Sequence, residues 1–180
     1  MPTVPPLRAA LAAYTPADAE EAAHQAAMRA LCDTAAPFAR AQWEPGHFTA
    51  SAFVLSPDSA SLLLIFHEKL LRWLQPGGHV EPEDNDVYAA VLREVAEETG
   101  IHDAEPVGAA PFDLDVHVIP ARKADPAHRH FDVRVLLRAR TFDFTAATDA
   151  LAAKWVPLGE VDRVETDASV MRAVRKLLAR

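Results

Sequence analysis

Three glutamates, Glu94, Glu97 and Glu98, lie close together near the end of a predicted helix at residues 86–99. Residues three or four positions apart are neighbours on a helix surface, so Glu94 lies close enough to the other two for their carboxylates to repel one another. Carboxylate oxygens are the ligands that Mg²⁺ and Mn²⁺ prefer, and such a cation would remove the repulsion. The spacing indicates a divalent metal site, and a solvated acidic helix face is the alternative that the glutamates alone leave open.

The predicted helix is amphipathic, and its apolar side helps to decide between these two interpretations. The valines that face the core recur at intervals of four residues: Val87, Val91 and Val95. Glu94 and Glu98 fall within the same apolar arc, and Glu97 lies just beside it. Because partly buried like charges raise their own pKa values or lower stability, this position favours a bound cation.

The helix belongs to a longer motif in the sequence. Residues 77–81 read Gly-Gly-His-Val-Glu, Ala90 follows, and residues 93–101 read Arg-Glu-Val-Ala-Glu-Glu-Thr-Gly-Ile. This motif resembles the Nudix box, a glycine and a later acidic residue followed by Arg-Glu-apolar-x-Glu-Glu-x-Gly-apolar, and its second half matches at every specified position. The resemblance implies an α+β fold, a Nudix-type α/β/α sandwich with a mixed sheet, in which the box forms a loop, a helix and a loop.

The resemblance also implies a role for each box residue. Glu94, Glu97 and Glu98 would ligate Mg²⁺ or Mn²⁺ with help from the Gly78 carbonyl, and Arg93 would orient the glutamates through charge-assisted hydrogen bonds. The reaction would be attack of water on phosphorus in a nucleotide or a nucleoside-diphosphate-linked substrate, that is, hydrolysis of a phosphoanhydride bond. The metal would lower the pKa of the water and neutralise the phosphates.

Two departures from the family pattern affect the assignment of the acidic residues. The segment between Gly78 and Arg93 is one residue longer than usual, so the acidic box position is Asp84 when counted forward and Asn85 when counted back; we favour Asp84. Many relatives carry a glutamate in the loop before a late tryptophan strand, where this chain has Asp149. Asp149 is therefore a candidate catalytic base, and Glu97 or Glu98 must activate the water otherwise.

Several histidines and arginines form a second set of candidates for binding substrate. Polar and apolar residues alternate along 113–117 and 128–135, so the polar side chains of each strand share one face. If these strands pair, His117, His130 and Asp132 can meet, where they could bind phosphate, a base or a second metal. The substrate candidates are His79, His117 and His130, with Arg72 and Arg134 as phosphate contacts. Ordinary polar strand residues and surface arginines are the alternative interpretation.

The elements that would position these residues follow from periodicity and turn residues. We expect an N-terminal helical extension over 1–45, with Thr15 capping its second helix, and a Nudix domain over 46–180. The expected helices are 5–14, 16–35, 86–99 and 168–180, and the expected strands are 47–55, 61–67, 72–75, 105–119, 130–140 and 154–157. The extension would pack on the main domain or on a partner subunit in a homodimer.

Composition limits the broad class of the protein. The chain has 180 residues, a net charge of −8 and one cysteine, Cys32. We interpret Cys32 as a structural residue of an Ala-rich helix. The acidic balance argues against binding a nucleic-acid backbone, and no segment approaches the about 20 apolar residues that span a bilayer. With no signal peptide or disulfide pair, we expect a cytoplasmic protein that acts on a small molecule.

Two other functions share the fold that the resemblance implies. An isopentenyl-diphosphate isomerase requires a cysteine where this chain has Gly77, and it alters the glutamate helix. A non-catalytic ligand-sensing or interaction domain typically loses box glutamates, and none is lost here. The substrate stays undefined, because the run WLQPGGH at residues 73–79 resembles a bacterial subgroup of undefined specificity.

Overall fold

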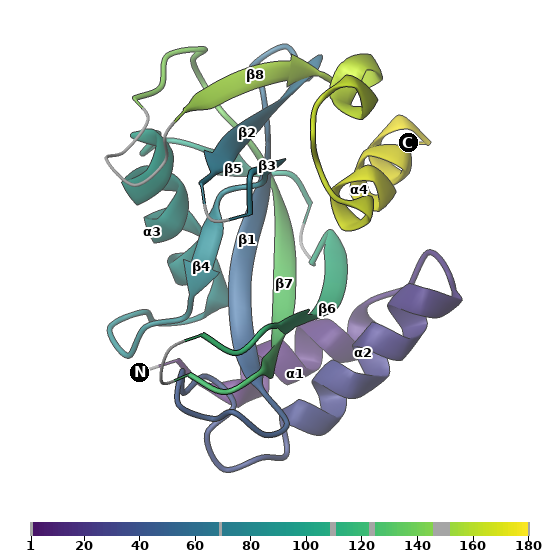
Figure 1. Cartoon of the computed structure of the whole chain (residues 1–180), viewed down its shortest axis with the longest axis vertical. Coiled ribbons are helices and arrows are strands. Elements are labelled where there is room, and N and C mark those ends of the chain that lie inside the picture. The colour runs from purple at the N-terminus through teal and green to yellow at the C-terminus, as the bar shows by residue number, and fades with distance from the viewer. Residues whose placement is uncertain (1, 69, 109–110, 123–124, 146–151, 180) are drawn as a thin grey trace. The chain divides into compact units, whose positions relative to one another are not determined.

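The computed structural model describes most of the chain: residues 2–68, 70–108, 111–122, 125–145 and 152–179. The chain divides into two compact units, Met1–Ala50 with Gly78–Val91 and Ala110–Val135, and Ser51–Gly77 with Leu92–Ala109 and Leu136–Arg180. Strands β1 (His47–Leu55) and β7 (His128–Arg138) and helix α3 (Val87–Thr99) each contribute residues to both units (Figure 1). Within the described residues, no helix is long and apolar enough to cross a membrane.

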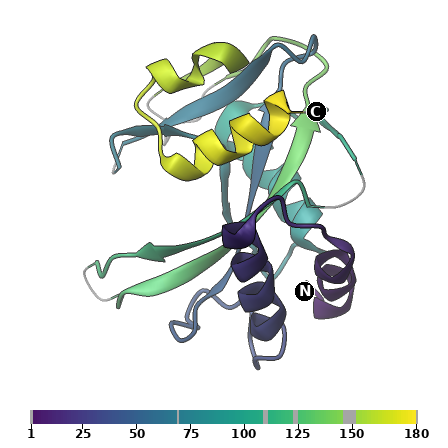
Figure 2. The same ribbon diagram turned by 90° about the vertical axis from the view of Figure 1, so that its right-hand side faces the viewer.

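The first unit contains helices α1 (Val4–Ala13) and α2 (Ala19–Leu31) and strand β6 (Asp113–Ile119). Strand β6 pairs antiparallel with β7, in a register that sets Asp113 opposite Arg134 and His117 opposite His130. Figure 2 shows these two strands side by side as a two-stranded ribbon. The pairing on which the meeting of these polar side chains depends is therefore present.

A buried carboxylate fixes the N-terminal helices to β6. Glu21 of α2 is fully buried; it accepts hydrogen bonds from the backbone N–H of Leu114 at 3.2 Å and of Ala17 at 2.6 Å. The hydroxyl of Tyr14 also contacts this carboxylate and lies 3.0 Å from the carbonyl oxygen of Phe112. The extension therefore packs on β6, one of the two arrangements expected from the sequence.

Replacing Glu21 by Ala is expected to destabilise the protein by about 1–3 kcal/mol, because it leaves the buried N–H of Leu114 without its acceptor. Urea unfolding followed by circular dichroism measures this change. The matched control is Glu20→Ala in the same first turn, where the side chain is exposed and the expected change is within about 0.5 kcal/mol. Equal losses in the two variants would contradict the bridging role of Glu21.

The second unit is built around β2 (Ser61–His67), which forms a hairpin with β1 and pairs antiparallel with two further strands. Its other elements are β3 (Arg72–Leu74), β5 (Glu105–Pro106), β8 (Ala153–Pro157), the 3-10 helix η1 (Leu158–Arg163) and helix α4 (Ala168–Leu178). Strand β5 pairs with the end of β7, and Asp167 caps α4 by accepting from the N–H of Val170 at 2.9 Å. The strands expected at 47–55 and 61–67 are therefore confirmed, and a short polar turn joins them.

The expected α+β class, with a mixed sheet and N-terminal helices, is confirmed, but some boundaries differ. Asp18 caps α2 in place of Thr15, since its carboxylate accepts the N–H of Glu21 at 2.8 Å. The single strand expected at 105–119 is two strands, because Gly108 turns the chain with a φ of +98°. Strand β4 (Gly77–His79) and η1 were not predicted from the sequence.

Candidate active site

Glu98 lies near the end of α3, and strand β4, which precedes this helix in the sequence, holds its side chain in place. The backbone N–H of Gly77 donates to its Oε2 at 2.8 Å. Gly77 is positioned by the segment before it, where Pro76 accepts the N–H of Ala52 of β1 at 2.9 Å. Burial raises the pKa of Glu98 to about 7; the neighbouring charges of Glu94 and Glu97 add to the rise, which the Gly77 hydrogen bond only partly opposes.

Arg93 connects the other two glutamates of the helix. Its Nη1 donates to Glu94 Oε1 at 2.9 Å and to Glu97 Oε2 at 3.0 Å. The side chain of Glu94 is 14% exposed and that of Glu97 is 58% exposed, as expected for residues within and beside the apolar arc. The buried valines Val87, Val91 and Val95 confirm that arc. Arg93 therefore holds two carboxylates of the cluster in fixed positions.

The helix also has well-defined ends. Asp86 caps its start by accepting the N–H of Ala89 at 2.9 Å, and Gly100 ends it with a φ of +68°. Beyond the helix, the N–H of Thr145 donates to the carbonyl of Thr99 at 2.8 Å. The last turn of α3, which carries the glutamates, is therefore anchored on the side of its C-terminus.

The donor set of this cluster fits a hard divalent cation. It offers carboxylate oxygens alone, the chemistry that Mg²⁺ and Mn²⁺ prefer over nitrogen or sulfur. One arginine contacts two of the carboxylates, and burial and repulsion raise the pKa of the third. A divalent cation would supply the positive charge that the half-buried Glu98 lacks.

A comparison with known protein families identifies the family in which this arrangement occurs. The profile of the NUDIX domain matches residues 45–178, which is most of the chain. The chain belongs to the Nudix family. Its members are hydrolases that act on pyrophosphate bonds, so the expected enzyme class is confirmed.

Solved structures of Nudix proteins share the fold. A NUDIX-family hydrolase from Clostridium perfringens is 20% identical, with a TM-score of 0.57 over 74% of this chain and 97% of that chain. The dihydroneopterin triphosphate pyrophosphohydrolase of E. coli is 18% identical, with a TM-score of 0.60 over 74% and 96%. The NUDIX domain of Shewanella oneidensis NrtR, solved with ADP ribose, is 20% identical, with a TM-score of 0.52 over 74% and 86%. No curated protein sequence matches this chain.

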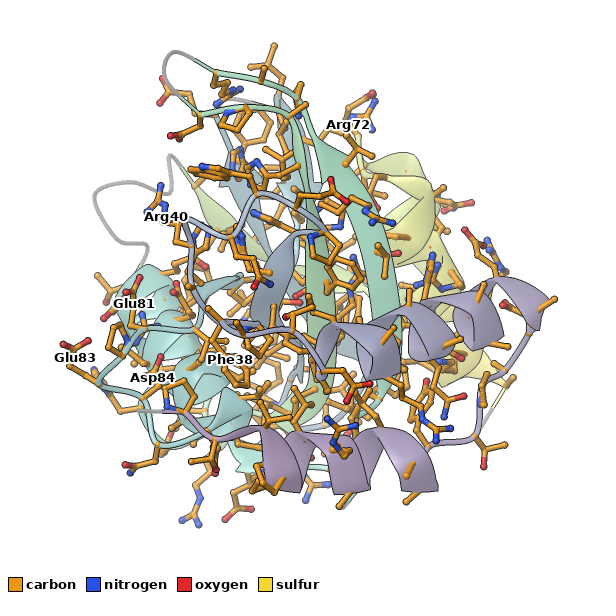
Figure 3. The ribbon with its side chains drawn as sticks, turned by 90° about the horizontal axis from the view of Figure 1, so that it is seen from below. Phe38, Arg40, Arg72, Glu81, Glu83 and Asp84 are labelled. Atoms are coloured by element: carbon orange, nitrogen blue, oxygen red, sulfur yellow. The ribbon has the colours of Figure 1, made fainter. Side chains whose placement is uncertain are left out.

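The loop of the Nudix box contains the two candidates for its acidic position. Asp84 is buried, and its Oδ2 accepts the N–H of Glu81 at 2.8 Å, while the N–H of Asp84 donates to the carbonyl of Glu81 at 3.0 Å. Asn85 is exposed. Figure 3 shows Glu81, Glu83 and Asp84 together in the loop that leads into α3. Asp84 therefore stabilises the turn of the box, a role that Asn85 does not share.

Two predicted residues remain to be placed, Asp149 and Arg72. Asp149 falls outside the described residues. Arg72 is exposed at the start of β3, where it lies opposite His67 of β2. Next to it, Trp73 packs between elements of the second unit, with the ammonium of Lys154 3.9 Å from the centre of its ring. The placement of Arg72 leaves its guanidinium accessible to an anion.

The three histidines predicted from the sequence lie in one group, which includes a fourth that was missed. The ring centres of His79 and His130 are 5.1 Å apart, and those of His117 and His130 are 5.6 Å apart. His47, the first residue of β1, lies 5.2 Å from His79 and 4.9 Å from His130. In the sequence, the alternation of His47 and Thr49 with apolar residues on a strand is the signal that could have included it.

Arg134 is not available to a substrate phosphate, contrary to the expectation from the sequence. Its guanidinium is 2% exposed and contacts three carboxylates: Asp132 at 2.9 Å, Asp115 at 3.1 Å and Asp113 at 3.3 Å. Burial alone would lower the pKa of Arg134, but the three negative charges raise it. The correction follows from the β6–β7 register, which sets Asp113 opposite Arg134 and encloses its charge.

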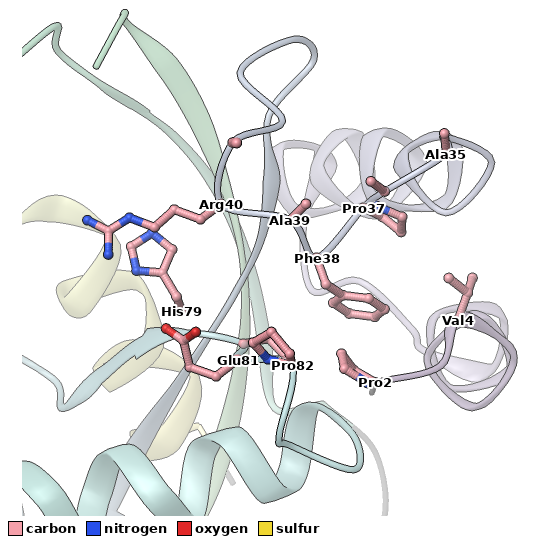
Figure 4. A pocket seen from close by; sticks show the side chains of 13 residues that line it. Pro2, Val4, Ala35, Pro37, Phe38, Ala39, Arg40, His79, Glu81 and Pro82 are labelled. Carbon is pink, nitrogen blue, oxygen red and sulfur yellow. The ribbon is translucent and has the colours of Figure 1, made fainter. Parts of the chain in front are cut away.

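The first unit also contains a cavity of about 590 Å³ beside His79. Figure 4 shows Arg40, His79 and Glu81 on one side of it and the ring of Phe38 on the other, with Pro2 and Val4 nearby. Its volume lies within the range of small-molecule pockets, and its walls combine apolar surface with a few charged groups. Neither Arg40 nor Phe38 was singled out from the sequence.

Proposed function

We propose that this protein is a metal-dependent hydrolase that cleaves a phosphoanhydride bond in a nucleotide or nucleoside-diphosphate-linked substrate by attack of water on phosphorus. The observation that carries the proposal is the glutamate cluster of α3. Arg93 holds Glu94 and Glu97, and burial together with these neighbouring charges raises the pKa of Glu98 to about 7. A solvated acidic helix face would not bury Glu98 or bond it to Gly77.

Each residue of the cluster has a proposed role. Glu94, Glu97, Glu98 and the carbonyl of Gly78 are the proposed ligands of Mg²⁺ or Mn²⁺. When bound, the cation would lower the pKa of the attacking water and neutralise charge on the phosphates. Arg93 would keep the carboxylates of Glu94 and Glu97 in place through its hydrogen bonds.

Glu98 is also our first candidate for the general base. A carboxylate beside the proposed metal site is placed where it can accept a proton from the attacking water. The Gly77 N–H fixes its Oε2, and Oε1 would take the proton from water. Asp149 is the second candidate, supported by its place before the late tryptophan strand. Glu97, which is mostly exposed, is the third.

The proposed substrate class is a nucleoside diphosphate linked to a second group, or a nucleoside triphosphate. One solved protein with this fold is named for dihydroneopterin triphosphate, and another was solved with ADP ribose. Both compounds contain a phosphoanhydride bond. We propose residues 46–180 as the hydrolase domain and residues 1–45 as an extension that stabilises it.

A substrate panel tests the proposal. It holds ADP ribose, nucleoside diphosphate sugars, dinucleoside polyphosphates and nucleoside triphosphates, each with Mg²⁺, Mn²⁺ or EDTA, and ion-exchange chromatography separates the products. We expect at least one compound to be cleaved at its phosphoanhydride with either cation and not with EDTA. Turnover that EDTA leaves unchanged would contradict the metal requirement.

The same panel separates the enzyme from a ligand-sensing Nudix domain. Isothermal titration with each compound and Mg²⁺ measures binding independently of turnover. A sensor would bind one compound and cleave none, and that result would overturn the proposal. Intact box glutamates favour the hydrolase.

A further inference from the structure

A compact group of histidines lies in the first unit, built from three strands. His47 begins β1, His79 ends β4 and His130 lies in β7. One ring nitrogen of each residue lies within 4.8 Å of the corresponding nitrogens of the other two. Two further imidazoles surround them, since His128 stacks on His47 at 5.1 Å and His117 lies 5.6 Å from His130. The chain thus brings five imidazoles together in one unit.

The environment of His47 points to a missing ligand. The residue is fully buried, and its Nδ1 lies 3.4 Å from the backbone carbonyl of Gln42, a long contact that favours the proton on that nitrogen. Its Nε2 then carries a lone pair, and this buried atom has no hydrogen-bond partner in the structure. Buried polar atoms without partners are rare, because each loses its hydrogen bonds to water and gains none in return.

The neighbouring rings are in the form that binds metals. Burial, together with the surrounding imidazoles, lowers the pKa of His130 to about 2, and burial lowers the pKa of His47. Both rings are therefore neutral at physiological pH, and neutral imidazole is the ligand for Zn²⁺ and related ions. The Nε2 atoms of His128 and His130 lie 3.3 Å apart, so one neutral ring donates a hydrogen bond to the other.

We propose that His47, His79 and His130 form a binding site for a divalent transition-metal ion of the Zn²⁺ class, beyond the site at the glutamates. Around a tetrahedral ion with metal–nitrogen bonds of about 2.0–2.1 Å, ligand nitrogens lie roughly 3.3–3.4 Å apart. The three nitrogens need to approach by roughly 1.5 Å at most from their present separations. Small rotations of the His79 and His130 side chains, both only partly buried, can supply that movement.

The chemistry of the ligands distinguishes this site from the one on α3. Three imidazoles favour Zn²⁺, Co²⁺ or Ni²⁺, whereas the carboxylates of Glu94, Glu97 and Glu98 favour Mg²⁺ or Mn²⁺. Three histidines leave a fourth position for water or an anion. Arg40, which lies beside His79 at the cavity in Figure 4, favours an anion there.

Cobalt titration of the untagged protein tests the site. Four-coordinate Co²⁺ with nitrogen ligands gives intense visible absorption, whereas Co²⁺ surrounded by six oxygens absorbs weakly. We expect one such ion per chain, displaced by Zn²⁺. His79→Ala and His130→Ala are each expected to lose the bands and to bind at least about 100-fold more weakly, a larger loss than the 10–100-fold typical of outer-shell partners.

Two control variants keep the result specific. His102→Ala removes an exposed histidine, and Glu98→Gln removes a proposed ligand of the other site; both are expected to keep the cobalt bands. Nitrogen-15 spectra of the wild-type imidazoles need no variant, and Zn²⁺ should shift the three rings together. Absence of stoichiometric binding, bands that survive loss of His79 and His130, or bands lost in Glu98→Gln would each overturn the proposal.

Discussion

Replacing Glu98 by Gln is expected to lower kcat for metal-dependent hydrolysis by about 10²-fold or more, the scale of losing a general base or a metal ligand. The amide keeps the size of the side chain and can still accept the Gly77 hydrogen bond, so the fold should persist. It removes the negative charge and the proton acceptor. Initial rates across a Mn²⁺ titration, with the best substrate of the panel, measure the effect.

Two further variants give the comparison its meaning. Glu97→Gln is expected to weaken activation by the metal, because Glu97 is a proposed ligand that Arg93 holds. Glu160→Gln changes an exposed glutamate of η1 and is expected to leave the rate unchanged. Unchanged turnover in both Glu97→Gln and Glu98→Gln would show that the active site lies elsewhere.

Replacing Arg134 by Met is expected to be the most destabilising single change, with a loss of about 3–5 kcal/mol in the free energy of unfolding. The substitution keeps much of the side-chain volume but leaves Asp113, Asp115 and Asp132 buried together without their cation. Removing one partner of a buried ion pair is more harmful than removing both, since an uncompensated charge stays in a low dielectric. Urea unfolding at neutral pH measures the loss.

Two matched variants separate the charge of Arg134 from the size of its side chain. Arg134→Lys, which keeps the charge but not the forked donors, is expected to fold with a smaller loss. Arg163→Met breaks an exposed pair with Glu160 and should change stability by about 0–1 kcal/mol. A similar small change in Arg134→Met would contradict the account of the cluster.

The parts of the protein that were predicted from the sequence are those fixed by local pattern. Helix α3, its glutamates and its terminal Gly100 follow from a four-residue apolar repeat and a motif that is continuous in the chain. The β1–β2 hairpin follows from alternation and a short polar turn. The opposition of His117 and His130 was also accessible, because it needs only two alternating strands that pair.

The parts that were missed depend on contacts between distant segments. The guanidinium of Arg134 is a group that commonly binds phosphate. Only the register of β6 against β7 shows that three carboxylates enclose it. His47 reads as an ordinary strand residue until β4 and β7 bring His79 and His130 to it. Likewise, the bond from Gly77 to Glu98 joins residues 21 positions apart. Side-chain pattern defines a face of an element, but its partner is set by tertiary packing.

The buried polar groups are of two kinds, which differ in whether the protein itself supplies their partners. Glu21 and Arg134 have their partners within the protein and serve its stability. Glu98 is half-buried and has a raised pKa. The Nε2 of His47 is buried and has no hydrogen-bond partner. Buried groups that the protein itself does not satisfy are the ones for which we propose ligands.

The most direct test of the central claim is phosphorus-31 NMR of the products formed in H₂¹⁸O with the best substrate of the panel. Attack of water on phosphorus predicts one ¹⁸O atom bonded to phosphorus in a single product, formed with Mg²⁺ and absent with EDTA. Product without ¹⁸O on phosphorus would mean that another bond is cleaved, and it would contradict phosphoanhydride hydrolysis at the glutamates of α3.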